Sequence, residues 1–250
     1  MPGDWVKRSV RAALPGPAAR WLALTKRRLT AWPPVGSVDL GDLRRADPVS
    51  RTFGLDRGTA IDRFYIERFL AARSDSIRGR ALEFGDDAYT RRFGGARVTR
   101  RDVLHPVPGN PAATIVADLE RGDPVPQAAF DCVIATQVLP VVYDTRAVVR
   151  AIARMLAPGG TALVTAPGIT QISRYDMDRW GDYWRFTSRS LRRLFEAEFP
   201  AERIEVGTHG NALASAAFLM GLAAEELERT ELEHHDPDYE LVITLVATRP

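Results

Sequence analysis

The sequence predicts an α/β protein built on a doubly wound, mostly parallel sheet. Apolar strand-like segments alternate with helical segments from about residue 59 onward. The segments "CVIAT" and "ALVTA" are apolar at nearly every position, which is typical of strands covered on both faces. In "ALEFGDDAYTRRFGG", residues 81–95, a buried strand runs directly into a glycine turn. These observations favour a layered sheet with helices on both sides.

Hydrophobic periodicity predicts each element in order. A helix is expected from residue 59, because Ile61, Phe64, Tyr65 and Phe69 recur at spacings of three and four. The same spacing predicts helices over 147–156 and 190–198, and the run 158–160 is a stop signal that restarts the sheet. Strands are expected over 81–84, 97–102, 114–116, 130–136, 161–165, 203–207 and 241–247.

Residues 1–50 are predicted to form a basic N-terminal arm, and residues 51–250 the α/β domain. Proline and glycine limit the arm to short helices, expected over 5–14 and 18–30. Seven cations and no acid lie between residues 5 and 28: Lys7, Arg8, Arg11, Arg20, Lys26, Arg27 and Arg28. Apolar residues alternate with them, so residues 1–30 can contact an anionic membrane, dock on a partner protein, or pack on their own domain.

Bulk composition excludes several classes of protein. The 250 residues are 45% apolar and 26% charged, as in ordinary globular domains, and the net charge of +2 does not indicate a nucleic-acid-binding protein. Cys132 is the single cysteine, which excludes an internal disulfide framework and fits a reducing cytoplasm. No apolar run approaches the roughly 20 residues that span a bilayer. A cytoplasmic protein is expected.

Candidate cofactor residues follow the strands, because ligands of such sheets bind beyond the carboxyl ends. Glu83 and Gly85 come at the end of the first strand, where glycine permits a tight turn. Asp102 is predicted to end the second strand, where its carboxylate can accept both hydroxyls of a ribose. Asp118 and Gln137 follow the third and fourth strands. Together they favour an adenosine-containing ligand.

At this point the sequence resembles the class I S-adenosylmethionine-dependent methyltransferases of the small-molecule and glycan type. The likeness lies in "FDCVIATQVL", "MLAPGGTALVTAPG" and the final "YELVITLVATRP", and covers about residues 58–250. It implies a seven-stranded Rossmann-like sheet with an antiparallel last strand. It also implies an S-adenosylmethionine cofactor, held by Glu83, Gly85, Asp102, Asp118 and Gln137, and O-methylation of a small molecule, sugar or glycan precursor.

The first glycine-rich motif departs from that family's pattern. The second and third glycines are replaced by Asp87 and Tyr89, and a carboxylate at Asp87 is expected to repel the methionine carboxylate of the cofactor. The departure motivates an alternative from another class, a catalytically inactive binding or scaffolding protein. A nicotinamide-dependent oxidoreductase is disfavoured by the missing glycine triplet.

Aromatic and polar residues after the fifth strand are candidates for binding the acceptor. They are Tyr175, Trp180, Tyr183, Trp184 and Arg185, in a segment similar to one found in methyltransferase-like proteins. Aromatic faces can stack on a sugar or aromatic acceptor, although such residues also anchor loops.

Candidates for a catalytic base are His209, Asp178 and Asp182. For His209, capping or packing is the competing interpretation. No metal is expected, because the "HHD" run at 234–236 lacks a third ligand at a recognisable spacing.

Overall fold

The computed structural model describes residues 16–250, and its chain divides into two compact units, one ending at Ala46 and the other spanning Asp47–Pro250. The helix expected over 5–14 lies outside the described residues. The first unit contains helix α2 (Gly16–Thr30), which begins two residues earlier than expected and exposes Trp21, Leu22 and Leu24. None of the helices in this described range combines the length and apolar character needed to cross a membrane.

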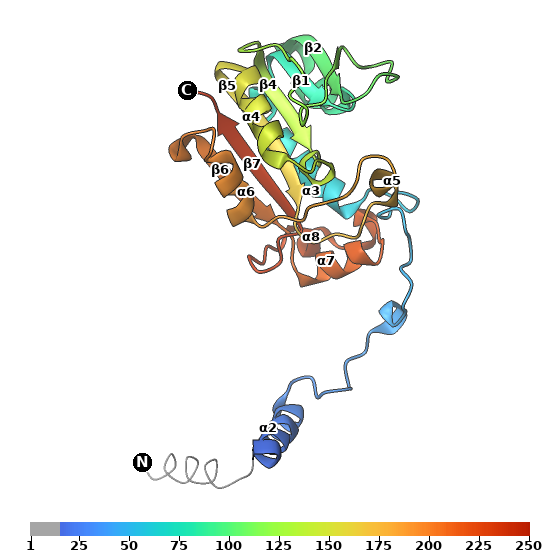
Figure 1. Cartoon of the computed structure of the whole chain (residues 1–250). Coiled ribbons are helices and arrows are strands. Elements are labelled where there is room, and N and C mark those ends of the chain that lie inside the picture. Colours follow the sequence, from blue (N-terminus) through green and yellow to red (C-terminus); the bar gives the residue numbers. More distant parts are fainter. Residues whose placement is uncertain (1–15) are drawn as a thin grey trace. The chain divides into compact units, whose positions relative to one another are not determined.

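The second unit is built on a seven-stranded sheet in the order β3-β2-β1-β4-β5-β7-β6 (Figure 1). The strands are β1 (Gly79–Phe84), β2 (Val98–His105), β3 (Ile115–Val116), β4 (Phe130–Thr136), β5 (Leu156–Pro167), β6 (Ile204–His209) and β7 (Val242–Thr248). Neighbours among β1 to β5 pair in parallel, whereas β7 is antiparallel to both β5 and β6. The predicted mostly parallel sheet with an antiparallel last strand is confirmed.

Helices cover both faces of this sheet. On one face, α3 (Ile61–Ala72), α7 (Ala212–Leu219) and α8 (Arg229–Glu233) share an apolar core with the strands. On the other, α4 (Thr145–Met155) and α6 (Ser188–Phe195) do so, while the short α5 (Arg174–Met177) follows β5 (Figure 1). Along β7, Val242 belongs to the first core and Ile243 to the second. This alternation explains why the central strands are apolar on both sides.

Two strands extend well beyond the ranges predicted from the sequence. β2 continues to His105, because the buried Val103 and Leu104 extend the strand past Asp102. β5 begins at Leu156, directly after α4, so the run 158–160 lies inside the strand. The pairing register with β4 shifts there, and Gly159 takes a φ of +76°. A left-handed residue at this bulge lets the strand include the run 158–160, which the sequence predicted to separate the helix from the strand.

The connection from β1 to β2 is compact. It contains a π-helical turn (Thr90–Gly94) and a 3₁₀ turn (Gly95–Arg97). From β1 the strand order runs to β2 and β3 on one side and to β4 and β5 on the other. The topological switch point therefore lies between the carboxyl ends of β1 and β4. Ligands of doubly wound sheets bind at such a point.

Candidate active site at the carboxyl ends of the strands

The buried carboxyl group of Glu83 organises the turn after β1. Its side chain accepts hydrogen bonds from the backbone N–H groups of Thr90 at 2.7 Å and Tyr89 at 3.2 Å. Glu83 is only 2% exposed, and this burial raises its pKa to about 7. The acid predicted from the sequence therefore fixes the backbone of the turn.

Gly85 presents an open side at the carboxyl edge of the sheet. Its φ of +88° favours glycine, and a Cβ atom added there would meet nothing within 4 Å. Its N–H donates to the Leu104 carbonyl at 3.0 Å, and its carbonyl accepts from Asn110 Nδ2 at 2.6 Å. The turn is thus held by both neighbours while one side of its backbone stays accessible.

Asp87 and Tyr89 lie differently from what the altered glycine motif suggested. Asp87 pairs with Arg91 Nε at 2.7 Å and with Arg101 Nε at 3.3 Å, so two guanidinium groups offset its charge. The Tyr89 ring stacks on Phe93 with 6.0 Å between ring centroids. Neither side chain lines the pocket that lies beyond β4 and β5. The two guanidinium groups therefore reduce the repulsion expected from the Asp87 carboxylate. Arg101 contacts Asp87 from β2, 14 residues further along the chain.

Asp102 does not lie at the carboxyl end of β2, and the predicted placement is wrong. Its register partner is Leu82, and its carboxylate pairs with Arg80 Nε at 2.7 Å and accepts from Thr114 Oγ1 at 3.0 Å. Burial opposes ionisation of Asp102, but these hydrogen bonds lower its pKa below the ordinary value. His105 occupies the strand end instead.

Asp118 and Gln137 do follow their strands at the expected edge. The Asp118 carboxylate accepts from the Glu120 N–H at 3.0 Å and pairs with Arg121 at 3.3 Å. Gln137 follows β4 with a φ of +56°, and its N–H donates to the Thr165 carbonyl at 3.0 Å. Its buried Nε2 atom has no hydrogen-bond partner within the part of the chain that the structure describes. A buried amide nitrogen without an acceptor is costly, which points to a ligand atom at this position.

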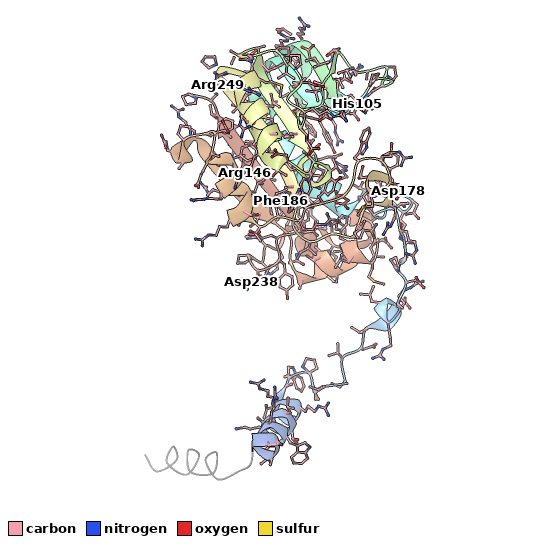
Figure 2. The ribbon with its side chains drawn as sticks, viewed as in Figure 1. His105, Arg146, Asp178, Phe186, Asp238 and Arg249 are labelled. Carbon is pink, nitrogen blue, oxygen red and sulfur yellow. The ribbon has the colours of Figure 1, made fainter. Side chains whose placement is uncertain are left out.

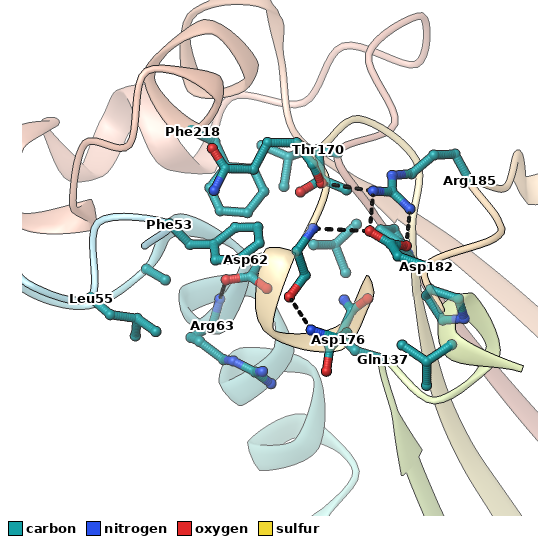
Figure 3. Close-up of a pocket in the computed structure, with 18 residues that line it drawn as sticks. Phe53, Leu55, Asp62, Arg63, Gln137, Thr170, Asp176, Asp182, Arg185 and Phe218 are labelled. Carbon is teal, nitrogen blue, oxygen red and sulfur yellow. Dashed lines mark hydrogen bonds and ion pairs between the residues drawn. The ribbon is translucent and has the colours of Figure 1, made fainter. Parts of the chain in front are cut away.

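A pocket of about 110 Å³ lies at the carboxyl ends of β4 and β5 (Figure 3). Five segments far apart in the sequence enclose it: the chain before and at the start of α3, the chain after β4, the loop after β5, the end of α7 and the start of β7. The apolar wall includes Phe53, Leu55 and Phe218, and the charged and amide groups include Asp62, Arg63, Gln137, Asp176, Asp182 and Arg185. Figure 3 shows Asp62 on one side and the Asp182–Arg185 pair on the other.

The loop after β5 is closed by an ion pair. Arg185 donates to both carboxylate oxygens of Asp182, at 2.6 and 2.8 Å, and also to the Gln171 carbonyl at 2.7 Å. The Ser173 N–H donates to the same carboxylate at 2.9 Å. Burial opposes the charged form, but these bonds lower the pKa of Asp182. The pair therefore fixes the wall of the pocket.

Of the predicted acceptor-binding residues, the structure places only Arg185 in the pocket wall. Tyr183 and Trp184 pack on Tyr143, with ring centroids 5.4 and 5.9 Å apart, and Trp184 Nε1 donates to the Val142 carbonyl at 3.0 Å. Trp180 contacts the His105 ring edge-on at 5.7 Å, whereas Tyr175 is exposed. These contacts pack the loop after β5 against the end of β2 and against the connection between β4 and α4.

The three candidate bases occupy different environments. Asp182 lines the pocket in its ion pair with Arg185. Asp178 is exposed on the α5 loop (Figure 2) and does not line the pocket. His209 ends β6, stacks on Tyr65 at 5.6 Å and lies 3.4 Å from Thr244 Oγ1; burial lowers its pKa. The structure thus does not bring the three together.

Sequence reasoning missed Asp62, Arg63, Phe53 and Phe218, because each reaches the pocket from a segment that precedes or follows the strands by many residues. One signal was available for Asp62, an acid in the first turn of a helix beside the buried Ile61. Within residues 16–250, no group of three histidine, cysteine, aspartate or glutamate side chains could hold a metal ion.

Residues 91–164 match the sequence model of a family described as a methyltransferase domain. The second unit has a Rossmann-like methyltransferase fold. The match runs from the crossover after β1 into β5, so the turn at Gly85 lies just before it. No curated protein is significantly similar to the chain in sequence.

The chain is also similar to solved structures. The [4+2]-cyclase SpnF is 19% identical with a TM-score of 0.50, and the similarity covers 78% of this chain and 84% of SpnF. The N-methyltransferase NodS from Bradyrhizobium japonicum WM9, in complex with S-adenosylhomocysteine, is 17% identical with a TM-score of 0.48 and coverages of 83% and 94%. At such identity the likeness to SpnF establishes the fold of the methyltransferase-like domain and leaves its reaction open.

Proposed function

We propose that the protein is an S-adenosylmethionine-dependent methyltransferase that methylates a hydroxyl group of a small molecule, sugar or glycan precursor. The observation that carries the proposal is the turn after β1, where buried Glu83 holds the backbone and Gly85 leaves one side open at the switch point. The family match and the fold agree with it.

The described residues fit such a cofactor at three strand ends. Gly85 would approach it with its backbone, Asp118 would meet it beyond β3, and the Gln137 amide would supply a polar contact beyond β4. At the end of β2, His105 replaces Asp102 as the residue in reach. S-adenosylmethionine supplies an activated methyl group. The pocket walls would align the acceptor and exclude water, which accounts for most of the rate enhancement expected here.

A non-catalytic binding protein is the second candidate. It is favoured by the small size of the pocket, about 110 Å³, compared with the roughly 300 Å³ or more of ordinary small-molecule sites. The cyclase SpnF also has this fold, so the fold alone does not require methyl transfer.

Calorimetric titration with S-adenosylhomocysteine tests the two candidates, with Gly85→Ala as the probe variant. The added methyl group would occupy the open side of the turn, and we expect at least about tenfold weaker binding. Gly159→Ala is the matched control: its φ is +76°, its Cβ would also meet nothing within 4 Å, and it lies at the opposite end of the strands. No binding by folded wild-type protein would support the non-catalytic candidate.

We also infer that the basic arm contacts an anionic membrane surface. In α2, Ala18, Trp21, Leu22 and Thr25 recur at spacings of three and four, and the helix ends with Arg27 and Arg28 in its last turn. An apolar face beside cations is typical of helices that lie at an anionic lipid interface. A protein partner is the alternative to the membrane as the surface that this helix contacts.

A further inference from the structure

We propose that the pocket beyond β4 and β5 binds the protonated amine of an amine-bearing acceptor, with Asp62 as its charge partner. The inference rests on the proposed function, because it names the class of acceptor for the same site. An amino sugar or a small amino alcohol has the required chemistry, a hydroxyl group and a cationic amine in one molecule.

Asp62 carries a carboxylate that lacks a cation in contact. Its Oδ1 atom accepts the Arg63 N–H at 2.8 Å, and within residues 16–250 neither a further hydrogen bond nor an ion pair reaches its side chain. The neighbouring Arg63 guanidinium donates to the Tyr89 hydroxyl instead, at 3.4 Å. Burial raises the pKa of Asp62, and the nearby Arg63 charge offsets only part of this effect. A cationic ligand in contact with the carboxylate would offset the remainder.

The surroundings of Asp62 favour a cation over an anion. Three carboxylates line the pocket, those of Asp62, Asp176 and Asp182, against two guanidinium groups. One of these, Arg185, forms a bidentate pair with Asp182. The other, Arg63, offsets part of the Asp62 charge, so the pocket keeps one more carboxylate than it has guanidinium groups, and an anionic group placed there would be repelled.

Gln137 gives a second, independent indication of a ligand in the same pocket. Its buried Nε2 atom lacks a partner among the described residues, while the residue itself lines the pocket wall. The Gln137 amide has two N–H groups and a carbonyl oxygen, so it can contact the cofactor with one group and the hydroxyl or amine of the acceptor with another. Phe53 and Phe218, whose rings lie 5.9 Å apart, supply an apolar wall for the carbon atoms of the ligand.

An acid in the first turn of a helix also has an ordinary structural explanation, because it interacts favourably with the helix dipole. The variant Asp62→Asn separates the two roles. Asparagine keeps an oxygen that can accept the Arg63 N–H, so the helix start is preserved, but it removes the charge that would attract an amine.

Amide NMR titration of the full chain tests the proposal at neutral pH with three small probes that share an isopropyl group: isobutylamine, isobutanol and isobutyrate. The Arg63 amide resonance reports directly on Asp62, since that N–H donates to its carboxylate. We expect the amine to bind about tenfold more tightly than the alcohol, and the carboxylate most weakly. Asp62→Asn should abolish the preference, while Asp178→Asn, which changes an exposed carboxylate outside the pocket wall, should retain it.

Equal binding of amine and alcohol, tighter binding of the carboxylate, or no response of the Arg63 resonance to any probe in folded protein would overturn the proposal. Calorimetry with S-adenosylhomocysteine on the same samples separates it from the proposed function. Cofactor binding without an amine preference overturns the amine site alone. An amine preference without cofactor binding overturns the methyltransferase proposal and leaves an amine-binding protein.

Discussion

Arg80 and Asp102 form an ion pair within the sheet, with 2.7 Å between Arg80 Nε and Asp102 Oδ2. They come from the neighbouring strands β1 and β2, and the Arg80 guanidinium also lies 4.6 Å from the centroid of the Phe130 ring. Asp102 is 2% exposed, so its charge depends on these partners. The pair holds two strands together at a distance from their carboxyl ends.

We therefore expect Asp102→Ala to lower the free energy of unfolding by about 3 kcal/mol, because it leaves Arg80 without its buried partner. The affinity of the folded fraction for S-adenosylhomocysteine should not change. Denaturant unfolding and calorimetry measure the two quantities. Arg100→Ala is the control, since this more exposed partner of Asp102 should contribute less than about 1 kcal/mol. Loss of cofactor affinity without loss of stability would restore Asp102 as a ligand-binding residue.

Glu83 should make stability depend on pH. Its pKa is raised to about 7 in the folded protein, so the folded state binds more protons than the unfolded state between about pH 4.5 and 7. The contribution of Glu83 to the free energy of unfolding is fully present at the acidic end of this window and is lost as the pH rises through it. This contribution can reach about 3 kcal/mol.

The variant Glu83→Gln should remove this dependence. The difference in unfolding free energy between wild type and variant, measured by denaturant titration from pH 5 to pH 8, is expected to shift in favour of the variant as pH rises. Taking the difference between wild type and variant cancels the pH dependence that other groups give to the unfolding free energy. One of these groups is His209, whose lowered pKa makes the protein more stable as the pH rises in part of this range. A constant difference across the range would contradict the expectation.

The ion pair between Asp182 and Arg185 should control the loop after β5. Asp182→Ala removes a carboxylate whose side chain is 4% exposed and leaves Arg185 without its bidentate partner. We expect faster tryptic cleavage at the exposed Arg174 and Arg179 in the same loop. Asp178→Ala, at the exposed C-cap directly after α5, should leave the cleavage rate at Arg174 unchanged. Equal rates in both variants would show that the pair does not hold the loop.

Charge reversal tests the membrane contact of the arm. The double variant Arg27→Glu/Arg28→Glu should bind vesicles rich in anionic lipid at least about tenfold less than wild type, because each cation near such a surface contributes about 1 kcal/mol. Arg44→Glu/Arg45→Glu changes the net charge equally in the same unit but lies outside α2, and is the control. Vesicle co-sedimentation measures both. Equal binding to zwitterionic vesicles would contradict the electrostatic explanation.

The sequence determined the elements of the fold because local periodicity and turn residues encode them. β4 has the bounds predicted from its apolar run, and the last strand lies antiparallel in the sheet as the resemblance implied. The places of Glu83 in β1 and of Gly85 in its following turn were predictable for the same reason, since both positions are set locally.

Only the tertiary structure decided which polar groups meet. The extent of β2 depends on pairing with β1 and β3, and that pairing moved Asp102 inside the sheet and brought His105 to its edge. Arg101 reaches Asp87 from another strand, and Phe53, Gln137, Arg185 and Phe218 meet in one pocket although long stretches of chain separate them. Such contacts depend on strand register and helix packing, which act between distant segments and leave no periodic signal in the sequence.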